Sequence, residues 1–270
     1  MEKTKYLGIS LYGSRRDEYA VAVHSLLRGE LPPDWEWVNS SANSIVARRL
    51  APPFAYYKEF LSRSPYENVK SVLRGSRCQR AVIRGEILKK KGFHSPKVLC
   101  WGKKGQRYFM VTKGIDAVSL STHIEKNWIS PLSGKELVAK RKLIEKLGNE
   151  IGTLHQAGVC HGDLRLSNIL VEEVDNDIVF HFIDNERNSY FSSVPRRLIK
   201  KNLVQVNMIA QPSVTRQDRL RFFKAYNTAY KRFGPADSVA LIRQVQEKTL
   251  ARQAKKKRKD VAGSEREVIR

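Results

Sequence analysis

Eight residues near the middle of the chain, His161 to Asn168, constrain its fold more than any other stretch. They place an acid, Asp163, and an amide, Asn168, five residues apart, just before the apolar run 169–171. A polar turn between a helix and a strand accounts for this stretch. So does a short rigid loop that aims two polar side chains into one cleft. The flanking sequence has to decide between the two.

The segment before this stretch predicts a long helix from Lys135 to Gln156. Its apolar residues recur at spacings of three and four, as in a helix with one buried stripe. They are Leu137, Ile144, Leu147, Ile151 and Leu154. Ser133 suits the position before the first turn, and Gly158 suits the left-handed residue that ends a helix. The polar stretch therefore follows a rigid, buried element.

A hairpin is expected after the stretch, with strands over residues 169–174 and 178–183. The second strand ends at Asp184. Mg2+ takes oxygen ligands, typically one or two protein groups together with phosphates and waters. Asp184 and Asn168 are therefore candidate metal ligands, although an acid at the end of a strand is also a common turn residue.

The N-terminal half predicts a small antiparallel sheet with one helix, over residues 77–91, before its last two strands. Five strands are expected, over residues 35–38, 44–50, 54–60, 97–101 and 107–112. Residues 1–34 predict one more strand, 5–11, and a short helix, 18–27, as an extension without chemistry. The link at 40–44 lacks glycine, so it is either a phosphate-facing loop or an ordinary hairpin loop.

Lys58 lies inside the third strand and shares a face with two aromatic residues, Tyr56 and Phe60. Such a lysine either lies along the surface or points into a cleft, where it needs a carboxylate partner. Glu86 is the candidate partner, because it lies one turn after Val82 on the apolar side of the predicted helix.

The same helix is expected to pack through Val82, Ile83 and Ile87. Its arginines recur at helical spacing and predict a solvated basic face. They are Arg77, Arg80 and Arg84.

Charge and cysteine content limit the class of protein. Lys and Arg outnumber Asp and Glu by 50 to 27, a formal charge of +23, which favours a polyanionic partner such as nucleic acid, an anionic membrane surface or a phosphorylated substrate. The three cysteines are widely spaced, which favours buried thiols in a reducing cytosol. No apolar run has the length of a membrane span, and the N-terminus lacks a signal-peptide pattern. We therefore expect a cytoplasmic protein.

The C-terminal part predicts helices over residues 195–207, 216–233 and 237–254, followed by a basic, disordered tail at 251–270. The expected layout is then an extension at 1–34, a nucleotide-binding lobe at 35–112, a catalytic lobe at 113–250 and the tail.

Taken together, these segments resemble the bacterial lipopolysaccharide core kinases, which phosphorylate Kdo or heptose in the inner core. The resemblance covers roughly residues 35–230 and rests on the segments 57–60, 75–81, 154–165, 168–171, 183–187, 201–205 and 218–223. It implies an α+β, two-lobed protein-kinase-like fold, with a small antiparallel-sheet N-lobe and a mostly helical C-lobe.

The resemblance also implies a mechanism, in which ATP donates a phosphoryl group to a sugar hydroxyl. Asp163 would orient and deprotonate the hydroxyl, and Arg165 would offset charge on the γ-phosphate. Lys58, held by Glu86, would contact the α- and β-phosphates. The Mg2+ ligands would be Asn168 and Asp184.

Three departures from protein kinases shape the expected substrate. Gly162 stands where protein kinases have an Arg after the loop His, and Asn185-Glu186 replaces the usual Phe-Gly. No Ala-Pro-Glu segment follows. The missing Ala-Pro-Glu segment argues against a protein substrate, and Gly162 argues against control by activation-loop phosphorylation.

The implied partner is lipopolysaccharide core or another anionic glycolipid, with possible peripheral contact with the anionic inner membrane and no specific nucleic acid. We hypothesise that a cluster of arginines contacts the acceptor. They are Arg187, Arg196, Arg197, Arg219 and Arg221. Two alternatives stay open: another small-molecule or atypical protein kinase of the same fold, and a nucleic-acid-binding protein on a catalytically dead scaffold. The second is weakened because the basic residues are not interleaved with aromatics.

Overall fold

A computed structural model of the chain describes residues 3–62, 74–128, 131–175, 177–209 and 214–268. The chain divides into two compact units. The small unit comprises residues 1–117 and 181–187, and the large unit comprises residues 118–180 and 188–270.

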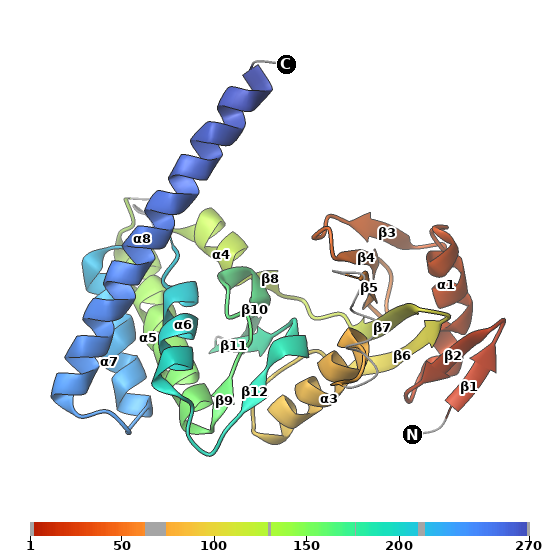
Figure 1. The fold of residues 1–270 in the computed structure, drawn as a ribbon, viewed down its shortest axis with the longest axis horizontal. Coiled ribbons are helices and arrows are strands. Elements are labelled where there is room, and N and C mark those ends of the chain that lie inside the picture. Colours follow the sequence, from red (N-terminus) through yellow and green to blue (C-terminus); the bar gives the residue numbers. More distant parts are fainter. Residues whose placement is uncertain (1–2, 63–73, 129–130, 176, 210–213, 269–270) are drawn as a thin grey trace. The chain divides into compact units, whose positions relative to one another are not determined.

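The small unit is built on a seven-stranded antiparallel sheet (Figure 1). Its strands are β1 (Lys3–Tyr6), β2 (Ile9–Tyr12), β3 (Trp35–Val38), β4 (Ser44–Arg49), β5 (Ala55–Phe60), β6 (Val98–Lys104) and β7 (Arg107–Lys113). They are arranged in the order β1-β2-β6-β7-β5-β4-β3.

The predicted strand over residues 5–11 is a hairpin. Leu7 and Gly8 take positive φ angles of 44° and 77°, which turn the chain back on itself. The resulting β2 pairs with β6, so the residues expected to form a separate extension are continuous with the sheet. The sheet therefore has two strands more than the sequence predicted.

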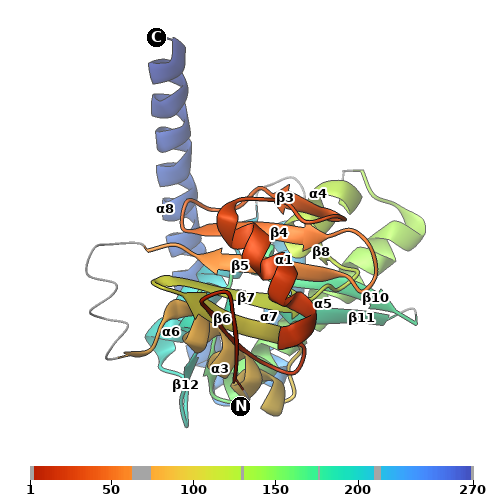
Figure 2. The same cartoon turned by 90° about the vertical axis from the view of Figure 1, so that its right-hand side faces the viewer.

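Each face of this sheet is covered by one helix. α1 (Arg16–Arg28) packs its buried side against Tyr57, Phe109 and neighbouring apolar residues. α3 (Arg77–Lys90) packs on the side that carries Phe60. Because side chains alternate along a strand, β5 turns Tyr57 toward α1 and Phe60, with Lys58, toward the α3 side. Figure 2 shows α1 lying across the sheet.

The large unit is mostly helical. Its helices are α4 (Leu120–Asn127), α5 (Gly134–Gln156), α6 (Arg196–Val206), α7 (Arg216–Ala229) and α8 (Pro235–Val268). Short strands accompany them: β8 (Val118–Ser119), β9 (Val159–Cys160), β10 (Ile169–Val174), β11 (Asp177–Phe182) and β12 (Ser189–Tyr190). The predicted left-handed end of α5 is confirmed, because Gly158 has φ 78°. The α+β class with a sheet unit and a helical unit is confirmed.

α5 and α7 pack so closely that their contact requires glycine. A Cβ on Gly148 would lie 2.4 Å from the carbonyl oxygen of Phe222, and a Cβ on Gly152 would lie 2.6 Å from that of Tyr226. Real Cβ atoms do not approach backbone oxygens to this distance. The two glycines therefore let the α7 backbone lie directly against the helix that leads to the Asp163 loop.

The C-terminal prediction was wrong in its extent. α8 continues to Val268, whereas the sequence suggested a helix that ends at Ala254 and a disordered tail. The segment is rich in Ala, Lys, Arg, Gln and Glu, which are strong helix formers, so its charge did not prevent a helix. The last two residues lie outside the described residues.

Two further expectations have an outcome. Cys78, Cys100 and Cys160 are buried free thiols, as predicted, and burial raises the pKa of the Cys100 thiol to about 12. Among the described residues, no helix combines the length and the apolar composition that crossing a membrane requires.

Candidate active site

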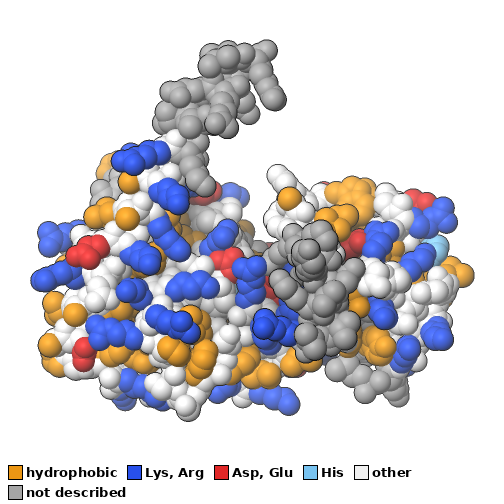
Figure 3. Space-filling view, in the orientation of Figure 1, with side chains coloured by type: hydrophobic (Ala, Val, Ile, Leu, Met, Phe, Trp, Pro, Cys, Tyr) orange, Lys and Arg blue, Asp and Glu red, His pale blue; other side chains and the backbone are white. Residues whose placement is uncertain are grey.

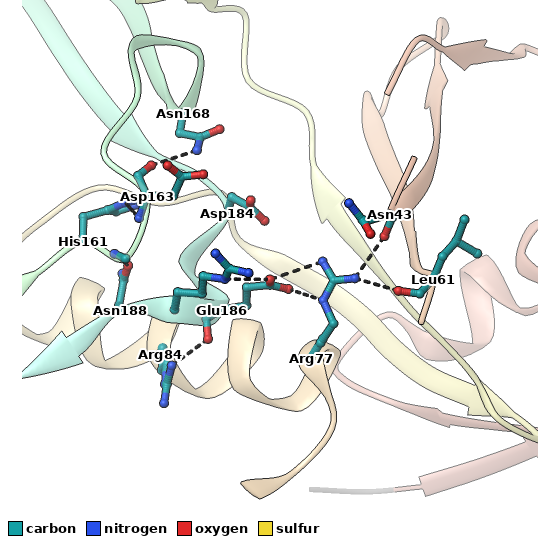
Figure 4. A network of polar contacts seen from close by, with 12 residues as sticks. Asn43, Leu61, Arg77, Arg84, His161, Asp163, Asn168, Asp184, Glu186 and Asn188 are labelled. Carbon is teal, nitrogen blue, oxygen red and sulfur yellow. Dashed lines mark hydrogen bonds and ion pairs between the residues drawn. The ribbon is translucent and has the colours of Figure 1, made fainter. Parts of the chain in front are cut away.

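In the large unit, the Asp163 carboxylate accepts hydrogen bonds from two side chains. Gln205 on α6 donates from Nε2 to Asp163 Oδ1 at 2.7 Å, and Arg165 donates from Nε to the same oxygen at 2.9 Å. Asn168 donates from Nδ2 to the Asp163 carbonyl at 2.9 Å, which closes the loop across its short 3-10 turn. The three loop residues predicted from sequence therefore lie together, and Figure 4 shows Asp163 beside Asn168.

These contacts orient the polar atoms of the loop. Both side-chain donors to Asp163 bind Oδ1, and no donor among the described residues contacts Oδ2. Because the amide nitrogen of Asn168 is used as a donor, its oxygen is the end that can accept a cation. The Asp163 side chain is 20% exposed, so a small molecule can reach it.

A buried polar layer supports the loop from below. Asn202 on α6 donates from Nδ2 to the His161 carbonyl at 2.7 Å, and Lys201 donates to the Gly162 carbonyl at 2.8 Å. The Gly162 N–H donates to Asn188 Oδ1 at 3.3 Å. His161 and Asn188 are fully buried. The backbone of the loop is thus fixed by side chains from α6 and from the segment after residue 187.

His155, at the end of α5, extends this layer. Its Nε2 lies 3.2 Å from Asn202 Oδ1, and its Nδ1 lies 3.0 Å from the Tyr226 hydroxyl. Since Asn202 donates through its nitrogen to His161, its oxygen accepts from His155 Nε2–H, which leaves Nδ1 to accept from Tyr226. Burial lowers the pKa of His155 to about 4, so the ring is neutral at physiological pH.

The small unit carries the other half of the predicted residues. Lys58 Nζ lies 2.7 Å from Asp184 Oδ1, and the two side chains are 22% and 26% exposed. Asp184 has φ 61°, in the left-handed region that non-glycine residues rarely adopt. Such a conformation persists only where the surroundings hold it, and it occurs most often at functional positions.

The predicted pairing of Lys58 with Glu86 is wrong. Glu86 pairs with Lys89, one turn further along α3, at 2.5 Å, and its side chain is 47% exposed. The buried stripe of α3 is Cys78, Ala81, Val82, Gly85 and Leu88. Ile83, expected on the inner face, is 57% exposed. Because the stripe is rotated from the predicted one, Glu86 lies at its solvent edge.

Two functional candidates were missed by the sequence reasoning. Arg77, predicted on a solvated face, is buried and binds Glu186 with Nε–Oε2 2.9 Å. Their side chains are 5% and 2% exposed, respectively. A signal was present in the sequence, because Arg77, Ala81 and Gly85 recur at four-residue spacing on the stripe that is buried.

The donor chemistry of these residues suits a nucleotide-bound cation. Within the described part of the chain, no group of three or more His, Cys, Asp or Glu residues is arranged to hold a metal. Mg2+ in phosphotransferases is usually held by one or two protein oxygens, with phosphates and waters as the remaining ligands. Asp184 in the small unit and Asn168 in the large unit each carry an oxygen of the kind that Mg2+ prefers.

Three of the five arginines proposed for acceptor contact bind other groups of the large unit. Arg219 donates to the carbonyls of Asn207 and Ile209 at 2.9 Å each, and Arg196 pairs with Asp237 at 2.7 Å. Arg221 pairs with Asp218 and Glu145, at 3.4 Å and 3.3 Å. These three residues therefore stabilise the large unit.

A sheet unit with its strand lysine and a helical unit with its Asp–Asn loop define the protein-kinase-like class of fold. The protein is similar to the solved structure of WaaP in complex with acyl carrier protein, with a TM-score of 0.60 and 18% identity, over 89% of this chain and 98% of that one. The model of the lipopolysaccharide kinase (Kdo/WaaP) family matches residues 73–226, more than half of the chain. The chain belongs to this family, which confirms the resemblance.

Two curated proteins are similar to parts of this chain, and one of them is a lipopolysaccharide kinase. The chain is 26% identical over 162 residues to the lipopolysaccharide core heptose(I) kinase WaaP of Pseudomonas aeruginosa, covering 56% of this chain and 59% of the relative. It is 32% identical over 92 residues to the EKC/KEOPS complex subunit bud32 of Dictyostelium discoideum, covering 34% of each. The chain thus spans less than two thirds of the length of either relative. The family relationship supports phosphotransferase activity.

Proposed function

We propose that this protein is an ATP-dependent kinase that phosphorylates a sugar hydroxyl, of Kdo or heptose, in the lipopolysaccharide inner core. The observation that carries the proposal is the Asp163 loop. Its carboxylate is fixed through Oδ1 by Gln205 and Arg165, which leaves Oδ2 to accept a proton. A positioned acid of this kind is what general base catalysis of phosphoryl transfer needs. Membership of the lipopolysaccharide kinase family supports the choice of acceptor.

In the proposed reaction, the sugar hydroxyl oxygen attacks the γ-phosphorus and its proton passes to Asp163 Oδ2. The bond between the γ-phosphorus and the bridging oxygen breaks, and ADP leaves. Lys58 binds the phosphates of ATP, and Arg165 offsets charge on the transferred group. Asn168 and Asp184 would hold Mg2+, which would neutralise phosphate charge.

The proposal is tested by transfer from γ-labelled ATP to a panel of acceptors: inner-core lipopolysaccharide, free Kdo, free heptose and a basic protein. We expect label in the core acceptor with the wild type and a loss of at least about 10²-fold with Asp163→Asn. Asp177→Asn is the matched control, because Asp177 is a surface carboxylate paired with Lys146. Label in the basic protein alone would favour an atypical protein kinase. Salt-dependent nucleic-acid binding without turnover would favour the dead scaffold.

We also propose that the large unit contacts the anionic cytoplasmic face of the inner membrane. Figure 3 shows Lys and Arg side chains spread over the face that carries α6 and α8. A groove of about 700 Å³ between α7 and α8 has apolar walls that include Leu220 and Leu250, which are 53% and 57% exposed. Its charged lining is entirely basic and consists of Arg216, Arg219, Arg243, Lys256 and Lys257. Exposed apolar side chains beside cations match an anionic lipid surface.

Sedimentation with vesicles tests this contact. The wild type should sediment with vesicles that contain phosphatidylglycerol and remain free with phosphatidylcholine alone. Leu220→Ser with Leu250→Ser should weaken sedimentation, whereas Val138→Ser should not, because Val138 is 64% exposed on α5 and outside the groove. Equal sedimentation of the groove variant and the wild type would refute the proposal.

A further inference from the structure

Arg77, the first residue of α3, uses its whole guanidinium group inside the small unit (Figure 4). Nε and Nη2 donate to the two carboxylate oxygens of Glu186, at 2.9 Å and 3.2 Å. Nη1 donates to the backbone carbonyls of Asn43 and Leu61, at 3.0 Å and 2.8 Å. The Leu61 N–H in turn donates to the Asn43 carbonyl at 3.1 Å. One side chain therefore joins three segments that are far apart in the sequence.

Each of these segments borders a residue of the proposed nucleotide site. Asn43 closes the link that precedes β4, the candidate phosphate-facing loop. Leu61 follows β5, the strand that carries Lys58. Glu186 lies two residues after Asp184, in the short turn that follows β11. The guanidinium therefore fixes three segments with respect to each other: the link at 40–44, strand β5 and the turn that follows Asp184.

α3 holds the same turn at a second point. Arg84, two helical turns after Arg77, donates from Nη1 to the Glu186 carbonyl at 2.6 Å. Asn185 in the turn donates to the Ser95 hydroxyl at 2.9 Å, just beyond the end of α3. Glu186 is thus held by its side chain and by its backbone from one rigid helix. This connection explains how the strained backbone at the preceding Asp184 is maintained.

The chemistry of the junction requires arginine. Two acceptors are carboxylate oxygens and two are carbonyl oxygens in fixed directions, which the planar fork of a guanidinium can satisfy together. The ring of Phe60 lies 5.3 Å from the guanidinium carbon and covers one of its faces. A lysine has one donor atom and no planar fork, so it cannot reach all four acceptors.

We propose that Arg77 and Glu186 are positioning residues that set the affinity for the Mg2+–ATP complex by holding Lys58 and Asp184 in register. The proposal rests on the proposed kinase function. It gives α3 an Arg77–Glu186 link to the nucleotide site in place of the Glu86–Lys58 pair that the sequence predicted. Neither residue touches the nucleotide in this proposal. Loss of such a supporting contact typically reduces metal affinity or activity about 10- to 100-fold.

The test separates positioning from folding by comparing four variants: Arg77→Lys, Arg77→Met, Glu186→Gln and the double variant Arg77→Met with Glu186→Gln. The matched control is Arg107→Met, because Arg107 also pairs with a buried glutamate, Glu59, at 2.6 Å in the same unit. Two quantities are measured on the full chain, the melting temperature and the Kd of a fluorescent ATP analogue with Mg2+. Hydrogen exchange at the Leu61 amide is followed without nucleotide.

We expect Arg77→Met to lose the most thermal stability, because the buried Glu186 carboxylate then loses its two-point contact and keeps the longer pair with Arg187, at 3.8 Å. The double variant should recover much of that stability but keep a Kd raised about 10- to 100-fold. Arg77→Lys should also show a raised Kd, and exchange at Leu61 should be faster in all three Arg77 variants. Arg107→Met should lose stability with the wild-type Kd and wild-type exchange at Leu61.

Two results overturn the inference. One is a Kd that returns to the wild-type value in the double variant as its stability returns, since the junction would then be structural only. The other is slow, wild-type exchange at Leu61 in Arg77→Lys and in the double variant. If Arg77→Met fails to fold, Arg77→Lys and the double variant still decide between a positioning role and a purely structural one. A wild type that binds no nucleotide overturns the proposed function instead, while the exchange measurement still tests the junction.

Discussion

The buried His155 ring predicts a specific loss of stability in mild acid. Its pKa falls from 6.5 to about 4 because the ring is desolvated, while its hydrogen bond to Asn202 acts in the opposite direction. Between these two values the unfolded chain binds a proton that the folded chain excludes, so folding weakens as the pH falls. The contribution is fully present above pH 6.5. Relative to neutral pH, the free energy of unfolding falls by about 2 kcal/mol at pH 5 and by about 3 kcal/mol at pH 4.

Urea denaturation at pH 7.5 and pH 5, followed by circular dichroism, measures this effect against His155→Gln. The variant lacks the titrating ring but can donate and accept hydrogen bonds. It is expected to be less stable at pH 7.5, by about 1 to 3 kcal/mol. Between the two pH values, however, it should lose about 2 kcal/mol less than the wild type. Equal losses in the two proteins would refute a neutral, desolvated His155.

Three further predictions concern the site and its support. Lys58→Met should abolish Mg2+–ATP binding measured by calorimetry. Glu86→Gln should keep a Kd within about twofold of the wild type, as expected for a surface pair. Equal losses of affinity in the two variants would favour the Lys58–Glu86 pair instead. Gly148→Ala should lower stability by about 1 to 3 kcal/mol in calorimetry, because its Cβ would meet the Phe222 carbonyl, and an unchanged melting temperature would contradict the close packing. Asn168→Ala should raise the Mg2+ concentration for half-maximal rate about 10- to 100-fold, and an unchanged requirement would exclude it as a ligand.

The parts that sequence predicted well are those in which local signals agree. The helix that ends at Gln156 carries a buried stripe at regular spacing and a glycine in the left-handed position after it, so its extent needed no tertiary information. The Asp163 loop follows directly, and its contacts to Arg165 and Asn168 span at most five residues. Such short-range contacts are constrained by the chain itself.

The parts that sequence missed depend on contacts between distant segments. Whether Arg77 faces solvent or Glu186, 109 residues away, depends on how α3 is rotated against the sheet. Apolar periodicity defines that rotation only loosely when residues such as Ile83 remain exposed. The partner of Lys58 is set by the turn after β11, at a separation of 126 residues. Charge pairing of this kind needs the fold before it can be assigned.

The central claim, phosphorylation of a sugar in the lipopolysaccharide inner core, is tested most directly by mass spectrometry of the core. Core from cells that lack the protein is compared with core from the same cells supplied with the wild type or with Asp163→Ala. We predict that one phosphate is missing without the protein, that the wild type restores it and that Asp163→Ala does not. A core of identical mass in all of these cells would contradict the account.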